Sequence, residues 1–148
     1  MHTQPIFRLA LALICVASLG CAEEAKYKSV QFGVFSREDS KLTFQAQTLV
    51  LKANETIIGW AFDIENPPKQ FTIREVISGP PGTSWPPGPG EVTDEGRTVS
   101  VVKTIHNPGL KFLFHNWTID HTDVAGNYKA TLYIDSKLIK EVDFVVSN

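Results

Sequence analysis

Residues 123–146 read DVAGNYKATLYIDSKLIKEVDFVV and contain the pattern from which the fold class can be inferred. From residue 127 onward, apolar and polar side chains alternate with a period of two, which is typical of a β-strand with one buried face. The apolar positions are Tyr128, Ala130, Leu132 and Ile134, then Leu138, Val142, Phe144 and Val146. The turn residues Asp135 and Ser136 separate the two runs. The stretch therefore predicts two antiparallel strands joined by a tight hairpin.

The same pattern extends back to residue 29 and predicts about eight strands. No segment keeps apolar residues at i, i+3, i+4 and i+7 over the length of a helix. We expect a bulge or break near Gln47–Thr48 and a phase slip at His115–Asn116. The other apolar positions expected in strands are Val30, Phe32, Val34, Leu42, Phe44, Ala46, Leu49, Leu51, Ile58, Trp60, Phe62, Ile64, Phe71, Ile73, Ile77, Val99, Val101, Ile105, Phe112, Phe114, Trp117 and Ile119. The fold class is all-β.

The segment before the hairpin resembles the D-x-x-G-x-Y corner of immunoglobulin-like domains, with Asp123, Gly126 and Tyr128 in the three defined positions. In that family the Tyr hydroxyl bonds back to the preceding turn. Antibody domains carry a Cys two residues later, where this chain has Ala130. The resemblance implies an immunoglobulin-like antiparallel β-sandwich without the inter-sheet disulfide.

The chain more narrowly resembles an uncharacterised family of bacterial exported immunoglobulin-like β-sandwich proteins. The residues that carry this resemblance are Phe32–Phe35, Asn66-Pro67-Pro68, Trp117-Thr118-Ile119 and the terminal hairpin. These motifs are structural, so the resemblance implies a fold and brings no activity with it.

The N-terminus has the pattern of an export signal. Met1–Arg8 is a short polar segment, and Leu9–Leu19 is an apolar run of 11 residues, too short to span a bilayer. The expected organisation is a signal peptide with a lipobox-like end at 1–21, a polar tether at 22–29 and the sandwich domain at 30–148.

Two cleavage sites compete at the end of this signal. Residues 18–21 (SLGC) resemble a bacterial lipobox that would leave an acylated Cys21, although Ser18 stands where the lipobox pattern prefers Leu. Cleavage after Ala22 would instead release a soluble periplasmic or secreted protein. Cys21 is the only Cys outside the apolar run, which favours lipidation at this residue. Ala22 after it is not the Asp that bacterial sorting rules associate with inner-membrane retention, so we expect an outer-membrane lipoprotein facing the periplasm or the surface. The glycosylation triplets at Asn54 and Asn116 leave eukaryotic secretion as an alternative.

Composition and motifs limit the function classes. The net charge of −2 gives no Lys/Arg surplus to neutralise phosphates, so we expect no nucleic-acid partner. The same charge gives no reason for electrostatic binding to an anionic membrane, so the only membrane contact expected is through the lipid on Cys21. His106, His115 and His121 have no zinc-like spacing and are interpreted as surface or loop residues. No activated nucleophile or paired-carboxylate motif is present, so we expect that the protein is not an enzyme and that it holds no cofactor and no metal ion.

One segment differs from the strands around it. Gly79–Gly90 (GPPGTSWPPGPG) holds five Pro and four Gly in 12 residues and must form a loop, which we call the Pro-Gly loop. Trp85, Pro86 and Pro87 form a candidate binding loop. Alternatively, Trp85 caps the core with a partly exposed ring edge while the prolines stiffen the loop, and this is the interpretation we favour.

The sequence leaves two functions open. The first is a non-catalytic module of the bacterial envelope that binds an unknown protein partner. The second is a small-ligand or glycan-binding domain that uses Trp85 and the Pro-Gly loop. A glycan site needs further aromatic rings coplanar with Trp85 together with hydrogen-bonding side chains, whereas a docking module needs an exposed apolar patch.

Overall fold

The computed structural model describes residues 24–39, 41–46, 50–52, 56–88, 90–106 and 109–147. The signal peptide and Cys21 lie outside these residues. The strands are β1 (Lys26–Glu38), β2 (Lys41–Ala46), β3 (Val50–Lys52), β4 (Thr56–Glu65), β5 (Gln70–Ser78), β6 (Glu91–Thr93), β7 (Thr98–His106), β8 (Phe112–Ile119), β9 (Gly126–Ile134) and β10 (Lys137–Ser147), with a 3-10 turn, η1 (Asp94–Gly96). The predicted all-β fold is confirmed. Two strands of three residues each raise the number above the eight expected: β3 contains the expected strand position Leu51 but is separate from β2, and β6 was not predicted.

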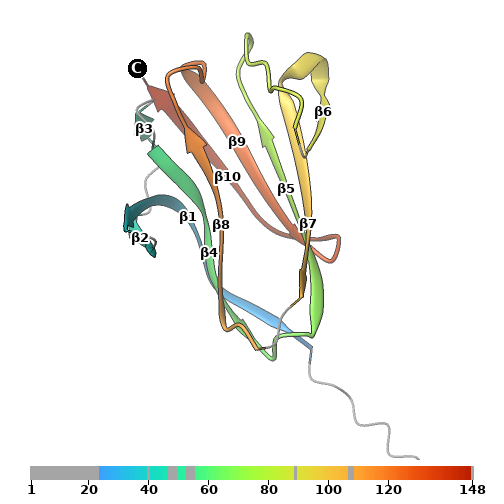
Figure 1. The fold of residues 1–148 in the computed structure, drawn as a ribbon. Helices are drawn as coiled ribbons and strands as arrows, with labels where there is room; N and C mark the ends of the chain where they lie inside the picture. Colours follow the sequence, from blue (N-terminus) through green and yellow to red (C-terminus); the bar gives the residue numbers. More distant parts are fainter. Residues whose placement is uncertain are drawn as a thin grey trace, which may run out of the picture.

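The strands form two sheets that face each other (Figure 1). The first has the order β2-β1-β4-β8, and the second has the order β3-β10-β9-β5-β7-β6. All pairs are antiparallel except β3, which runs parallel to β10. β2 and β3 flank the break predicted near Gln47–Thr48 and belong to different sheets, while residues 47–49 themselves lie outside the described part.

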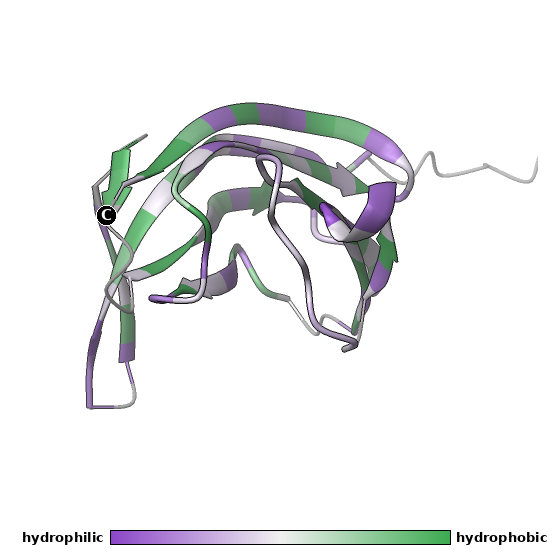
Figure 2. Cartoon of the chain, turned by 90° about the horizontal axis from the view of Figure 1, so that it is seen from above, coloured by the Kyte–Doolittle hydropathy of each residue, from purple (hydrophilic) through white to green (hydrophobic). Residues whose placement is uncertain are grey.

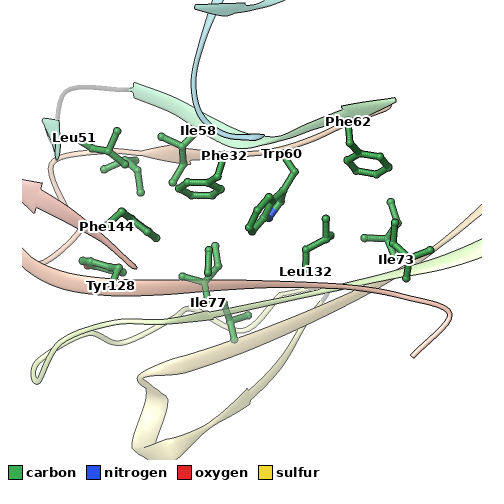
Figure 3. Packing of buried hydrophobic residues seen from close by; sticks show 14 of the residues in the cluster. Phe32, Leu51, Ile58, Trp60, Phe62, Ile73, Ile77, Tyr128, Leu132 and Phe144 are labelled. Carbon is green, nitrogen blue, oxygen red and sulfur yellow. The ribbon is translucent and has the colours of Figure 1, made fainter. Parts of the chain in front are cut away.

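The core lies between the sheets and is built from the alternating side chains of both. Hydrophobic and hydrophilic positions alternate along the long strands in Figure 2. Figure 3 shows Trp60 and Phe62 from β4 pointing toward Leu132 and Ile73 of the opposite sheet. All four side chains are buried. Among the described residues no helix is long and apolar enough to cross a membrane.

The first strand begins before the residue at which the domain was predicted to start. β1 begins at Lys26, inside the segment expected to be a tether. Tyr27 pairs with Ile64, and its ring lies 6.0 Å from that of Phe62 in an edge-on contact. A register shift follows Lys28, and Ser29 has a left-handed φ of 53°. This irregularity breaks the period of two, so the sequence pattern did not connect Tyr27 with the rest of the strand.

The phase slip expected at His115–Asn116 is wrong. β8 pairs with β4 without a register shift, so that His115 lies opposite Trp60. Phe114 points to the outer face of the first sheet, where its ring lies 5.1 Å from that of Phe35. Because aromatic residues usually face the core, we expected Phe114 on the inner face of this strand and His115 on the outer one. The register instead places His115 on the inner face.

Candidate functional site

The corner residues gather at one end of the sandwich, before β9. The Tyr128 hydroxyl donates a hydrogen bond to the Val124 carbonyl over 2.8 Å, which is the bond that the corner motif predicts. Asp123 accepts a hydrogen bond from the Asp120 backbone N–H, also over 2.8 Å. Gly126 has φ 149°, and a Cβ there would lie 2.9 Å from the ring of Pro80. The corner therefore packs closely against the Pro-Gly loop.

The Pro-Gly loop is held against the turn η1. The Trp85 backbone N–H donates to the Gly96 carbonyl over 3.0 Å, and its indole Nε1–H donates to the Arg97 carbonyl over 2.9 Å. The Trp85 ring is half-buried and packs against the edge of the core, while Pro86 and Pro87 are exposed. This is the placement that the capping interpretation predicts, and the exposed part of the ring faces outward.

A cleft of about 350 Å³ lies between this loop and the end of β8. Its walls come from residues Gly82 to Pro86 on one side and from Trp117, Thr118, Asp120, Thr122, Asp123 and Val124 on the other. Both segments lie at the same end of the sandwich in Figure 1. The rings of Trp85 and Trp117 are 6.1 Å apart, with their planes inclined by 56°. The cleft is thus lined by two tryptophans that meet at an angle.

Two carboxylates line the cleft, and their pKa values are shifted in opposite directions. The Thr122 hydroxyl and backbone N–H donate to Asp120 over 2.6 and 2.7 Å, and these hydrogen bonds lower the pKa of Asp120. Burial raises the pKa of Asp123, and the charge of Asp120 raises it further. The residues that line the cleft in the described structure include no Lys, Arg or His. The charged side chains that line the cleft among the described residues are therefore both acidic, and the neighbouring His121 also helps to lower the pKa of Asp120.

A buried carboxylate lies behind the cleft, inside the core. Glu75 on β5 has no exposed surface. Its Oε1 accepts a hydrogen bond of 2.6 Å from Trp60 Nε1, and its Oε2 accepts one from Trp117 Nε1. His115 Nδ1 lies 2.6 Å from the same Oε2. These four residues, the Glu75 cluster, join β5 of one sheet to β4 and β8 of the other.

Sequence reasoning missed this cluster, although one signal for it was present. Phe71, Ile73 and Ile77 were assigned to the buried face of β5, and Glu75 occupies the alternating position between them. A Glu in such a register must find hydrogen-bond partners inside the protein. The interpretation of His115 as a surface or loop residue is wrong, since its side chain is only 15% exposed. His106 and His121 are exposed, as predicted.

Two of the larger hollows, of about 630 and 690 Å³, lie elsewhere on the described surface. The first is lined mainly by residues of β9 and β10, and the second surrounds the exposed Lys28–Glu65 ion pair. Neither is lined by tryptophan. The described residues include no group of three or more His, Cys, Asp or Glu side chains able to hold a metal ion.

Comparison with known proteins supports the fold. The structure is similar to that of an immunoglobulin-like protein from Pseudomonas aeruginosa, with TM-score 0.57 and 21% identity over 86% of this chain and 100% of that one. A DNA glycosylase, AlkC, from Pseudomonas fluorescens in complex with DNA aligns less well, with TM-score 0.47 and 11% identity over 84% of this chain and 31% of the other.

No curated protein matches the chain. The sequence profile of one family matches residues 30–147, which is nearly the whole of the predicted domain. The uncharacterised β-sandwich family that the sequence motifs suggested is thereby confirmed. The chain belongs to the family described as the PM0630 beta sandwich domain.

Proposed function

We propose that this protein is a non-catalytic binding module exported to the bacterial envelope, anchored in the outer membrane through a lipid on Cys21, and that the cleft between the Pro-Gly loop and β8 holds a small ligand. The N-terminal pattern supports export, with the lipobox-like end supporting the anchor. The immunoglobulin-like fold contributes a rigid frame and does not itself specify a ligand.

One observation carries the binding site: Trp85 is held in place on both its backbone and its ring. Its two hydrogen bonds, to Gly96 of η1 and to Arg97 directly after it, fix the indole before any ligand arrives. Prolines on either side restrict the loop further. A binding surface that is ordered in advance loses less entropy when it binds, and this preorganisation increases affinity.

The geometry favours a small ligand over a protein partner. Ligand pockets usually have volumes of about 300–1,000 Å³, and the cleft, at about 350 Å³, falls within that range. A docking module would need a contiguous exposed apolar patch. The large hydrophobic residues that are most exposed, Val50, Val102, Leu110 and Leu138, instead lie on four different segments.

Photo-crosslinking tests the site. A benzophenone amino acid replaces Ser84, which is exposed and lines the cleft. The control carries it at Lys137, beyond the far end of β9. Both full-length proteins are produced in a bacterial host and irradiated in intact cells, and their peptides are examined by mass spectrometry. We expect a discrete small-molecule adduct at position 84 and none at position 137. Equal labelling at both positions, or no adduct at 84, would show that the cleft is not the binding site.

A further inference from the structure

The indole N–H groups of the two tryptophans that line the cleft are used inside the protein, so these groups offer a ligand no free hydrogen-bond donor. The Trp85 indole donates to the Arg97 carbonyl, and the Trp117 indole donates to buried Glu75. The faces of aromatic rings carry partial negative charge and attract cations. The aromatic walls therefore favour a cationic or apolar group.

The remaining groups of the cleft point to a cation. Asp120 and Asp123 contribute two carboxylates, and the described lining residues contribute no basic side chain. Asp123 is partly buried beside Asp120, and this burial together with the neighbouring charge raises its pKa. A positive charge bound in the cleft would relieve that repulsion.

We propose that the cleft binds a small organic cation that carries an alkylated or quaternary ammonium group. The inference rests on the proposed function and names its ligand class. Methylated ammonium groups suit such a site, because they spread their charge over an apolar surface that contacts aromatic rings while carboxylates neutralise it.

The same geometry argues against a sugar and against an anion as the ligand. A flat sugar platform needs coplanar rings, whereas Trp85 and Trp117 are inclined by 56°. An anion would meet two carboxylates without a basic partner among the described lining residues. The acceptor-rich, aromatic lining thus distinguishes an ammonium ligand from both.

Calorimetric titration of the full-length protein in low-salt buffer at pH 7 tests the inference. The probes are choline and its uncharged isostere, 3,3-dimethylbutan-1-ol. We expect choline to bind and the neutral isostere to bind at least about tenfold more weakly, since only the cation gains from the carboxylates and ring faces. Equal affinity for the two probes, or no binding of choline, would overturn the inference.

A variant that removes both carboxylate charges of the cleft tests their role, and a variant that removes a distant charge is its matched control. Asp120→Asn combined with Asp123→Asn keeps side-chain oxygens that can accept the hydrogen bonds of the turn. We expect this variant to bind choline about tenfold more weakly. Asp63→Asn removes an exposed charge at the other end of β4 and should leave the affinity unchanged. If the double variant does not fold, the comparison of choline with its neutral isostere on the native chain still decides.

A competition experiment distinguishes failure of this inference from failure of the proposed function. If choline suppresses the adduct formed at position 84, the cationic ligand class is supported. If the adduct forms and excess choline leaves it unchanged, the cleft binds a ligand of another class, and only the present inference is wrong.

Discussion

The substitution Glu75→Gln tests whether the buried carboxylate holds the two sheets together. Gln has the size of Glu but offers one acceptor oxygen and one NH₂ donor. Trp60 donates to one oxygen of Glu75, while Trp117 and His115 approach the other. Whichever way the amide turns, its NH₂ group faces at least one buried N–H group, which then has no acceptor.

The expected loss of stability follows from the one buried N–H group that is left without an acceptor. One buried donor without a partner costs about 1–3 kcal/mol, and a hydrogen bond to a charged acceptor contributes more than a neutral one. We therefore expect Glu75→Gln to lower the free energy of unfolding by about 2–4 kcal/mol, out of a total of about 5–15 kcal/mol for a typical domain. Because a small domain loses about 4 °C per kcal/mol, the Tm should fall by roughly 8–16 °C.

Urea denaturation followed by tryptophan fluorescence measures this loss. Glu141→Gln is the control, since Glu141 is an exposed partner of Lys129 and should contribute about 1 kcal/mol or less. In a double-mutant cycle, Trp117→Phe removes one donor and should recover part of the cost of Glu75→Gln, with a coupling of about 0.5–3 kcal/mol. A loss below about 0.5 kcal/mol for Glu75→Gln, or strict additivity in the cycle, would refute the reasoning.

Four further predictions concern single residues. Tyr128→Phe removes the hydrogen bond to the Val124 carbonyl and should cost about 1–3 kcal/mol in urea denaturation, and an unchanged midpoint would contradict the corner role. Trp85→Ala should cost roughly 2–4 kcal/mol because the half-buried ring covers the core edge, and unchanged stability would show that it does not cap. The raised pKa of Asp123 means that the protonated carboxyl contributes stability below about pH 4, which is lost as the pH rises through the folded pKa. Asp123→Asn should therefore raise the Tm relative to the native chain at pH 7 and lose this advantage at acidic pH, and the opposite trend would be incompatible with that assignment. Cys21→Ala should abolish incorporation of labelled palmitate in a bacterial host, whereas a native N-terminus at Glu23 without lipid would exclude the anchor.

The strand positions were predictable from the sequence because a sheet with one buried face imposes a period of two. That signal located eight strands, and the D-x-x-G-x-Y motif located the corner at Tyr128. It could not assign strands to sheets, and the crossing from β2 to β3 depends on contacts between distant segments. It also predicted the wrong face of the sheet for Phe114, because this aromatic side chain lies on the outer surface and not in the core.

The cleft was only half predictable from the sequence. The composition of residues 79–90 identified the loop and Trp85 as exceptional. Nothing local could indicate that Trp117, 32 positions later, would lie beside Trp85, because their contact depends on how the loop folds against the end of β8. The Glu75 cluster depends in the same way on three strands that meet only in the folded protein.

Trp117 makes the cleft and the core interdependent. Its N–H group is bonded to Glu75 in the core, while its ring forms one wall of the cleft. A side chain held at one end by a buried hydrogen bond has fewer rotamers available, so the wall that a ligand meets is fixed by a carboxylate that no ligand touches. Glu75→Gln should consequently weaken binding in the cleft as well as stability, whereas the Asp120 and Asp123 variants should affect binding by removing charge. Comparison of the two kinds of variant at equal folded fraction would separate the shape of the site from its charge.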